Sequence, residues 1–250
     1  TASVEIKGLT FSYPGTSQPV LKDIDLAIQP GMTLGILGKT GSGKTTLVKL
    51  LLRLYDPPEG TIFIGGVDIR RLKLESLRSQ IGYVPQDGFL FSTTIRENIA
   101  FSRRQAEREE IERAARQARI YDNICEFPDG FETKLGERGI TLSGGQRQRT
   151  SLARGLLKQA PLMILDDSVS AVDAVTESEI LQTIREERGG KSTIIIAHRI
   201  SALKHADLIV VMNEGRIVQR GRHEELVAQP GLYAELQAIQ EEGSQHAARH

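Results

Sequence analysis

The chain has 250 residues, 39% hydrophobic and 26% charged, a composition typical of a globular protein and not of a disordered chain or a fibre. Lysine plus arginine and aspartate plus glutamate both number 32, so a zero net charge argues against a nucleic-acid clamp. One cysteine, Cys125, excludes an internal disulfide and indicates a reducing, intracellular setting. Because Cys125 lies close to Phe127, we expect a buried small hydrophobic residue there rather than a nucleophile.

No apolar run approaches the roughly 20 residues that a spanning helix needs, and residues 1–5 do not resemble a signal peptide. Any membrane role is therefore expected to come through a partner or through a part of the protein outside this sequence.

Apolar and polar residues alternate along residues 4–11 and 20–28, which predicts two strands joined through a turn at residues 13–16. Tyr13 stands at the mouth of this turn, where its aromatic face could stack on a base. On spacing alone, a packing residue is the simpler interpretation of Tyr13.

Residues 38–45 read Gly-Lys-Thr-Gly-Ser-Gly-Lys-Thr, the phosphate-loop pattern of two glycines separated by four residues and followed by Lys and a hydroxyl residue. A short buried strand is predicted before the loop, at residues 33–37, and an amphipathic helix after it, at residues 46–52. The glycines let backbone N–H groups surround an anion, Lys44 can reach the outer phosphates, and Thr45 can hold Mg²⁺. The alternative, a glycine-rich turn that only precedes a helix, does not account for this strand, loop and helix order. The loop predicts a nucleoside triphosphate site.

Residues 81–86 form a second apolar run, and its polar end, Gln86, is expected at the carboxyl edge of a sheet, where ligands bind. From residue 87 to about residue 158 the sequence becomes charged and rich in alanine and arginine, with helical spacing over residues 107–119, which predicts a helical insert with a solvated face. Within it, residues 142–146 (Leu-Ser-Gly-Gly-Gln) precede a predicted helix at residues 147–157. This turn is either a second anion site at a helix N-terminus or a helix cap formed by Ser143.

Residues 161–167 predict a buried strand that ends in two carboxylates. Asp166 is placed to hold the Mg²⁺ shell, and Asp167 to orient or deprotonate a water. A further buried strand at residues 192–198 ends in His198, for which structural and functional roles are equally open. A hairpin over residues 208–218 and helices over residues 223–238 complete the domain, and residues 241–250 read as a frayed polar tail.

Taken together, these motifs resemble the ATP-binding domain of an ABC transporter, over nearly the whole length and in the family's order. The resemblance rests on the phosphate loop 38–45, Gln86 of the Q-loop, the signature 142–146, the strand ending in Asp166, the D-loop 170–173 and the switch His198. It also makes Tyr13 the expected adenine-stacking residue. The segment 136–139 (Gly-Glu-Arg-Gly) and the stretch 89–98 resemble exporters whose ATPase domain follows six membrane helices, and in these the region around residues 89–91 receives intracellular loops of the membrane domain.

The resemblance implies an α/β fold: a P-loop, RecA-like core with an N-terminal antiparallel β subdomain (residues 1–86 and 159–240), an inserted α-helical subdomain (residues 87–158) and a tail (residues 241–250). It also implies ATP and Mg²⁺ as cofactors and two domains that close head to tail. The expected catalytic residues are Asp167, His198, Gln86 and Lys44. The expected contacts to the chain's own ATP are Tyr13, Gly38, Lys39, Thr40, Gly41, Ser42, Gly43, Lys44, Thr45, Thr46, Gln86 and His198. The expected contacts to the partner's ATP are Ser143, Gly144, Gly145 and Gln146, and the expected Mg²⁺ ligands are Thr45, Gln86 and Asp166.

Asp167 is the main departure from the family pattern, which has Glu at the position that polarises the attacking water, and Ser168-Val169 also replace the usual Ala-Thr. A carboxylate about 1 Å short can cost roughly 100-fold in rate, so we expect slow hydrolysis at this site. With an intact signature, the chain resembles the degenerate-site half of a heterodimeric, multidrug-type exporter whose partner subunit carries Glu.

The expected location is the cytoplasmic face of the cell (inner) membrane within a transporter, with the isolated domain soluble. Two other functions stay open. One is a non-hydrolysing ATP switch or clamp. The other is a soluble ABC-type ATPase that acts on nucleic acid, although no long heptads or internal repeat support it.

Overall fold

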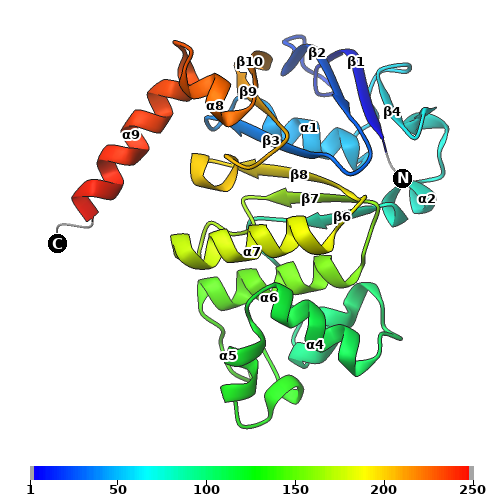
Figure 1. Cartoon of the computed structure of the whole chain (residues 1–250). Helices are drawn as coiled ribbons and strands as arrows, with labels where there is room; N and C mark the ends of the chain where they lie inside the picture. Colours follow the sequence, from blue (N-terminus) through cyan, green and yellow to red (C-terminus); the bar gives the residue numbers. More distant parts are fainter. Residues whose placement is uncertain (1–2, 248–250) are drawn as a thin grey trace. The chain divides into compact units, whose positions relative to one another are not determined.

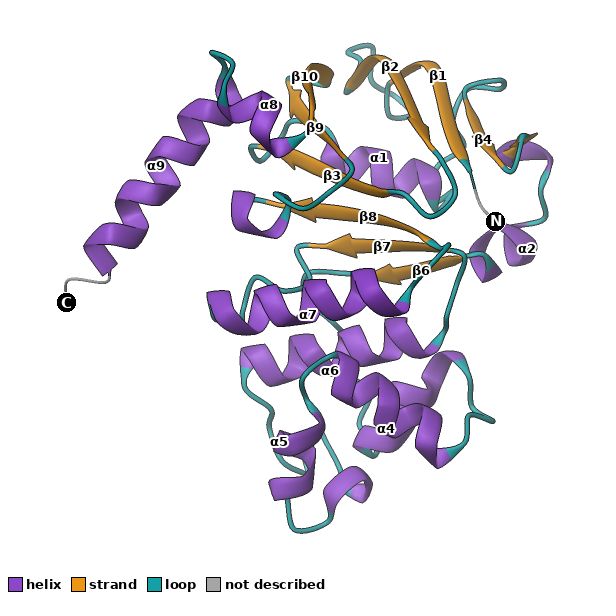
Figure 2. Ribbon diagram, viewed as in Figure 1, coloured by secondary structure: helices purple, strands orange, loops and turns teal. Residues whose placement is uncertain are grey.

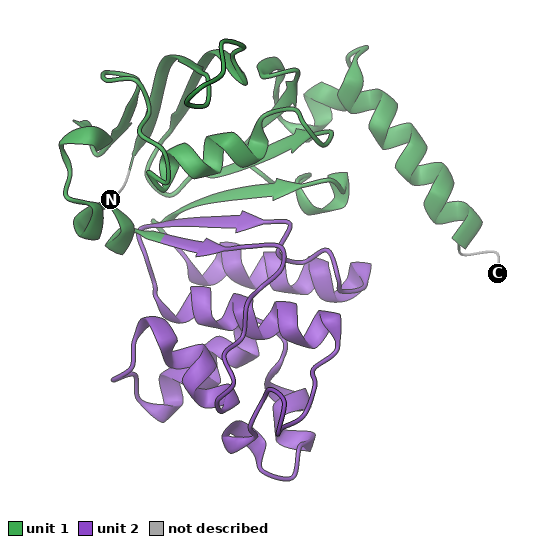
Figure 3. Cartoon of the chain, turned by 180° about the vertical axis from the view of Figure 1, so that it is seen from behind, with its two compact units in different colours: residues 1–81, 190–250 green, residues 82–189 purple. Residues whose placement is uncertain are grey.

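The computed structural model describes residues 3–247 and contains two compact units (Figure 3). Unit 1 comprises residues 1–81 and 190–250, and unit 2 comprises residues 82–189. These boundaries differ from the sequence-based ones, because unit 2 takes in two core strands and the helix at residues 174–187 as well as the helical segment. Figures 1 and 2 show the elements of each unit.

Unit 1 begins with a four-stranded antiparallel sheet in the order β2-β1-β4-β5. Its strands are β1 (Val4–Phe11), β2 (Leu21–Ile28), β4 (Ile62–Ile64) and β5 (Val67–Asp68). The alternation in the sequence predicted β1 and β2 because their apolar residues, such as Ile6 and Leu26, all face the core. The N-terminal antiparallel β subdomain is confirmed.

The other strands of unit 1 lie in the order β10-β9-β3-β8. β3 (Thr33–Gly38) pairs in parallel with both β8 (Ser192–Ala197) and β9 (Leu208–Asn213), and β10 (Arg216–Gly221) pairs with β9 as the predicted hairpin. β8 is buried throughout, as expected of a continuous apolar run in a parallel sheet. Helix α1 (Lys44–Leu51) follows β3, so the phosphate loop connects a parallel strand to a helix.

The remaining helical segments of unit 1 are η1 (Ile69–Arg71), α2 (Leu74–Ser79), η4 (Ile200–Ala202), α8 (His223–Val227) and α9 (Leu232–Ala247). α9 continues beyond the predicted end at residue 238, through most of the expected polar tail. Good helix-forming residues and bonds one turn apart, such as Gln237 Nε2 to Glu241 Oε1 at 2.7 Å, support the added turns. Residues 248–250 of the predicted tail lie outside the described residues.

Unit 2 contains neighbouring strands β6 (Ile81–Val84, whose first residue ends unit 1) and β7 (Leu162–Asp166). The predicted helical segment is confirmed as α-helical. The helical elements of unit 2 are α3 (Ile95–Ile99), η2 (Ala100–Ser102), α4 (Arg108–Gln117), α5 (Tyr121–Glu126), η3 (Gly130–Glu132), α6 (Gly144–Leu157) and α7 (Ala174–Glu187).

Cys125 was expected to be buried, and this prediction is wrong, because the structure places Cys125 on the exposed side of α5. α5 has six residues and buries only Ile124. A helix this short has a single inward position, which the branched side chain of Ile124 occupies.

Candidate functional site

The phosphate loop runs from the end of β3 at Gly38 to the start of α1 at Lys44. Gly41 and Gly43 have φ angles of +83° and +105°, a conformation that disfavours residues with a side chain. A Cβ atom on Gly38 would lie 2.4 Å from Ser42 Oγ and 2.7 Å from the carbonyl oxygen of Met212. The glycines are therefore required by the backbone conformation and close packing of the loop.

The loop fits an anionic ligand. Ser42 Oγ is buried, and it makes no hydrogen bond within residues 3–247. A buried hydroxyl without a partner is unfavourable, and a phosphate oxygen would supply the missing acceptor. Lys44 is 8% exposed and donates from Nζ to the carbonyl oxygen of Gly38. The first turn of α1 contains no acidic residue, so nothing there repels a phosphate from the helix N-terminus.

Tyr13 lies beside α1, the helix that directly follows the loop. Its hydroxyl is 2.7 Å from Thr46 Oγ1, and its ring centroid is 5.3 Å from that of Phe11 and 5.0 Å from that of Tyr55, both edge to face. The structure therefore holds the predicted base-stacking residue close to the predicted phosphate contact Thr46.

His198 follows the last residue of β8 and is exposed. The side chain of Gln240 on α9 donates to the carbonyl oxygen of His198 (2.7 Å) and accepts from the backbone N–H of Ile200 (2.9 Å). α9 thus fixes the backbone around the histidine, a contact that no pattern in the sequence predicts.

In unit 2, β7 ends at Asp166, the predicted Mg²⁺ ligand. The hydroxyl of Tyr83 on β6 donates to Asp166 Oδ2 at 3.1 Å. Burial raises the pKa of the Tyr83 phenol, and the Asp166 carboxylate raises it further, so the phenol remains a donor at neutral pH. Sequence reasoning missed Tyr83, although its place one residue before Val84 on the strand leading to the Q-loop was a usable signal.

Asp167, the predicted water-activating carboxylate, is 8% exposed and has a φ angle of +52°. Its carbonyl oxygen accepts a hydrogen bond from Gln148 Nε2 at 3.1 Å. The next residue, Ser168, donates from Oγ to the carbonyl oxygen of Val84 at 2.7 Å. Two buried side chains therefore fix the turn that presents the carboxylate, and sequence reasoning singled out Ser168 only as a departure from the family.

The signature turn caps α6. Ser143 Oγ accepts from the N–H of Gln146 (3.2 Å), and Gln146 Oε1 accepts from the N–H of Ser143 (3.1 Å). This capping box confirms the helix-cap interpretation, and the anion-binding role of residues 143–146 stays a prediction. A Cβ atom on Gly145 would lie 2.9 Å from the carbonyl oxygen of Ala171, so the turn packs closely against the D-loop.

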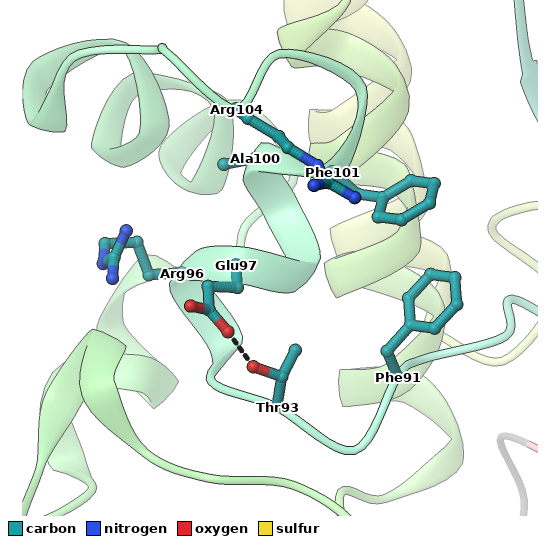
Figure 4. Close-up of a pocket in the computed structure, with 7 residues that line it drawn as sticks. All are labelled: Phe91, Thr93, Arg96, Glu97, Ala100, Phe101 and Arg104. Atoms are coloured by element: carbon teal, nitrogen blue, oxygen red, sulfur yellow. Dashed lines mark hydrogen bonds between the residues drawn. The ribbon is translucent and has the colours of Figure 1, made fainter.

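A cavity of about 370 Å³ opens in unit 2 beside the stretch 89–98 (Figure 4). Phe91 and Phe101 stack on one side with ring centroids 4.5 Å apart. The remaining lining residues are Thr93, Arg96, Glu97, Ala100 and Arg104. The cavity therefore combines an aromatic wall with charged side chains.

Within residues 3–247, no helix is long and apolar enough to cross a membrane. The same residues contain no cluster of three or more His, Cys, Asp or Glu side chains that could hold a metal ion by themselves.

A family model described as "ABC transporter" matches residues 21–170. Among curated proteins, the probable multidrug resistance ABC transporter ATP-binding/permease protein YheI of Bacillus subtilis is 50% identical over 227 residues, which cover 91% of this chain and 39% of that protein. The ATP-dependent lipid A-core flippase of Pseudomonas fluorescens is 46% identical over 237 residues, covering 94% of this chain and 40% of that protein. Among solved structures, a bacterial Atm1-family ABC exporter with ATP bound matches with a TM-score of 0.91 at 42% identity, covering 96% of this chain and 42% of that one. The chain thus spans about two fifths of the length of these relatives.

Proposed function

Because the chain belongs to the ABC transporter family, we propose that it is the ATP-binding domain of an exporter and closes on ATP against a second such domain to drive transport. The observation that carries the proposal is the phosphate loop, with its obligatory glycines and a buried Ser42 hydroxyl that finds no partner among residues 3–247, at the N-terminus of α1. Relatives named as ATP-binding/permease proteins and exporters support the transport role.

Residues 38–46 would hold the phosphates of ATP, Tyr13 would stack on the adenine, and His198 would contact the nucleotide. The Mg²⁺ ligands would be Thr45, Gln86 and Asp166. When bound, Mg²⁺ would neutralise charge on the phosphates, and these side chains would orient the nucleotide.

The two ATP sites of the closed assembly are unequal. Asp167 is one methylene shorter than the Glu of the family pattern, which places its carboxylate about 1 Å short and costs roughly 100-fold, or about 2.7 kcal/mol of barrier. The signature residues 143–146 are complete and serve the ATP of the partner domain. The partner in this arrangement is a different subunit with Glu at the position of Asp167.

The cavity beside residues 89–98 is the docking place for an intracellular loop of the membrane domain. Phe89 is 69% exposed and Phe101 46% exposed, and aromatic rings that face solvent next to arginines are typical of protein interfaces. This docking places the chain on the cytoplasmic face of the membrane.

The test of the weak site is the steady-state ATPase rate of the purified chain and of its Asp167→Glu variant. We expect the variant to hydrolyse ATP about 100-fold faster, because the carboxylate regains its reach. Asp122→Glu, the same change at an exposed position of α5, serves as the control and should leave the rate unchanged. The proposal fails if Asp167→Glu does not raise the rate substantially.

A non-hydrolysing ATP switch is the second candidate, and Asp167 is also the observation that favours it. Tight retention of ATP without phosphate release, in both the parent chain and the Asp167→Glu variant, would support the switch over the slow ATPase.

A further inference from the structure

Gln148 is a buried polar side chain on α6, two residues beyond the signature turn. It is 4% exposed, and it has no role among the nucleotide and metal contacts proposed for this chain. An amide buried to this degree must satisfy both its donors and its acceptor.

The amide of Gln148 contacts three separate segments of unit 2. Its Nε2 lies 3.1 Å from each of three acceptors, which are the carbonyl oxygen of Gln86 in the Q-loop, the carbonyl oxygen of Asp167 and the hydroxyl of Ser170 in the D-loop. Its Oε1 accepts from the backbone N–H of Ala171 at 2.8 Å. The Ala171 bond fixes the orientation of the amide, because a flipped amide would place N–H against N–H and its oxygen against the two carbonyl oxygens.

α6 packs closely against Val84 and Gly88, the residues two positions before and after Gln86 of the Q-loop. A Cβ atom on Gly155 would lie 2.3 Å from Val84 Cγ2, and one on Gly88 would lie 2.3 Å from Ser151 Cβ. Residues 148, 151 and 155 share one face of the helix. Gln148 is therefore presented to its partners by a rigid helix face.

Among the hydrogen-bond partners of Gln148, Asp167 has the least favourable backbone conformation. Its φ angle of +52° is uncommon for a residue with a side chain, and such strain persists only where the surroundings enforce it. The bond from Gln148 Nε2 holds the Asp167 carbonyl, and the backbone N–H of Ser170 also points to this oxygen at 3.3 Å. The direction of the Asp167 side chain follows from this backbone conformation.

The amide has two N–H groups for three acceptors, so the bonds must be shared. One amide nitrogen therefore joins the Q-loop carbonyl of Gln86, the carbonyl of Asp167 and the D-loop hydroxyl of Ser170.

We propose that Gln148 is a positioning residue for ATP hydrolysis, which holds Asp167 in its left-handed conformation and ties it to the Q-loop, the D-loop and the signature helix. The inference rests on the proposed function, since it takes the carboxylate of Asp167 as the group that orients the water. Gln148 does not touch the nucleotide in this scheme, and it acts through the backbone of Asp167.

The test is a double-mutant cycle on the 250-residue chain, with Gln148→Met and Asp167→Glu alone and combined. With Gln148 present, Asp167→Glu should raise kcat about 100-fold, whereas in the Gln148→Met background the same change should raise it less than about 10-fold, because the longer carboxylate is no longer aimed. KM for ATP should change less than about 3-fold in both backgrounds, since the phosphate loop is intact. If Gln148 only stabilises the fold, Asp167→Glu will raise kcat by the same factor in both backgrounds, and the proposal is overturned.

Hydrogen exchange at the Ala171 amide gives a second readout, independent of catalysis. Gln148→Met should abolish the protection of this amide. Gln148→Glu keeps an acceptor oxygen for Ala171, so the protection should remain. In the Gln148→Glu background, however, Asp167→Glu should no longer give its gain in kcat. Unchanged Ala171 protection in Gln148→Met overturns the proposal. Gln182→Glu, on the exposed face of α7, controls for the same chemical change and should leave both readouts as in the parent chain.

The two proposals fail in different ways. If Asp167→Glu gives no gain even with Gln148 in place, the slow-site proposal fails, and Gln148 is then judged by Ala171 exchange and by a fall in kcat at constant KM in the parent background. If Gln148→Met does not fold, as shown by its melting curve, the Gln148→Glu variant takes its place in the cycle.

Discussion

Ser168→Ala would introduce the residue that the family pattern has at this position, and we expect it to destabilise this chain. Ser168 is 2% exposed, and its hydroxyl donates to the carbonyl oxygen of Val84 at 2.7 Å. Removing the donor leaves a buried carbonyl with one partner fewer, which costs about 1–3 kcal/mol. Because alanine fits the space of serine, no packing term offsets this loss, and we expect a fall of about 1–2 kcal/mol in the free energy of unfolding.

Urea denaturation and thermal melting measure the effect, which should be a drop of about 2–4 °C in Tm for each kcal/mol in a chain of this size. Hydrogen exchange of peptides from residues 82–189 should show the loss of protection in unit 2. Ser178→Ala, on the exposed face of α7, is the matched control and should change stability by less than about 0.5 kcal/mol. A change in Ser168→Ala no larger than that of the control would refute the reasoning.

Three further predictions concern the phosphate loop, the metal ligand and a buried carboxylate. Ser42→Ala should leave the nucleotide-free chain as stable or slightly more stable, because it deletes a buried hydroxyl without a partner in residues 3–247, while ATP binding measured by calorimetry should weaken. Tyr83→Phe should raise the Mn²⁺ concentration needed for half-saturation in the presence of ATP about 5-fold, equivalent to about 1 kcal/mol, because Asp166 loses an orienting donor; an unchanged electron paramagnetic resonance titration would contradict this. Burial raises the pKa of the Asp68 carboxyl, but two backbone N–H donors and the positive charges of Arg71 and Arg70 together outweigh it and lower the pKa overall. Asp68 therefore adds stability above pH 3.8 that is lost as the pH falls through its lower folded pKa, and urea titrations should show the deficit of Asp68→Asn shrinking below pH 3.8.

Strand and helix positions were predictable where periodicity and motif coincide. β3 and α1 were predicted because an apolar run, a glycine loop and a helical pattern follow one another in the sequence, and a phosphate loop needs this order of strand, loop and helix. The ends of β7 and β8 were predicted because polar residues follow buried runs. The roles of Asp166 and His198 in the site stay predictions.

Side-chain networks that join distant segments were not predictable. The bonds of Gln148 reach residues 62 positions before it and up to 23 positions after it, and no periodicity encodes such pairs. One signal was available, since Gln148, Ser151 and Gly155 place polar or small residues on a helix face that an ordinary core helix would fill with leucine. The φ angle of Asp167 and the exposure of Cys125 likewise follow from tertiary packing rather than from local sequence.

The left-handed conformation of Asp167 suggests a reason for Asp at this position and gives a last prediction. Among residues with side chains, Asp and Asn tolerate positive φ best, because their short polar side chains bond locally. Glu lacks this advantage, so Asp167→Glu should lower the free energy of unfolding by about 0.5–1 kcal/mol even as it raises the ATPase rate. The strain lies in the backbone and not in a nucleotide contact. The difference in Tm between the two proteins should therefore stay the same when ATP is added, apart from any difference in their affinity for ATP. A variant that gains activity and is also more stable would show that the backbone conformation at residue 167 carries no cost, and that the length of the side chain alone separates this site from the family pattern.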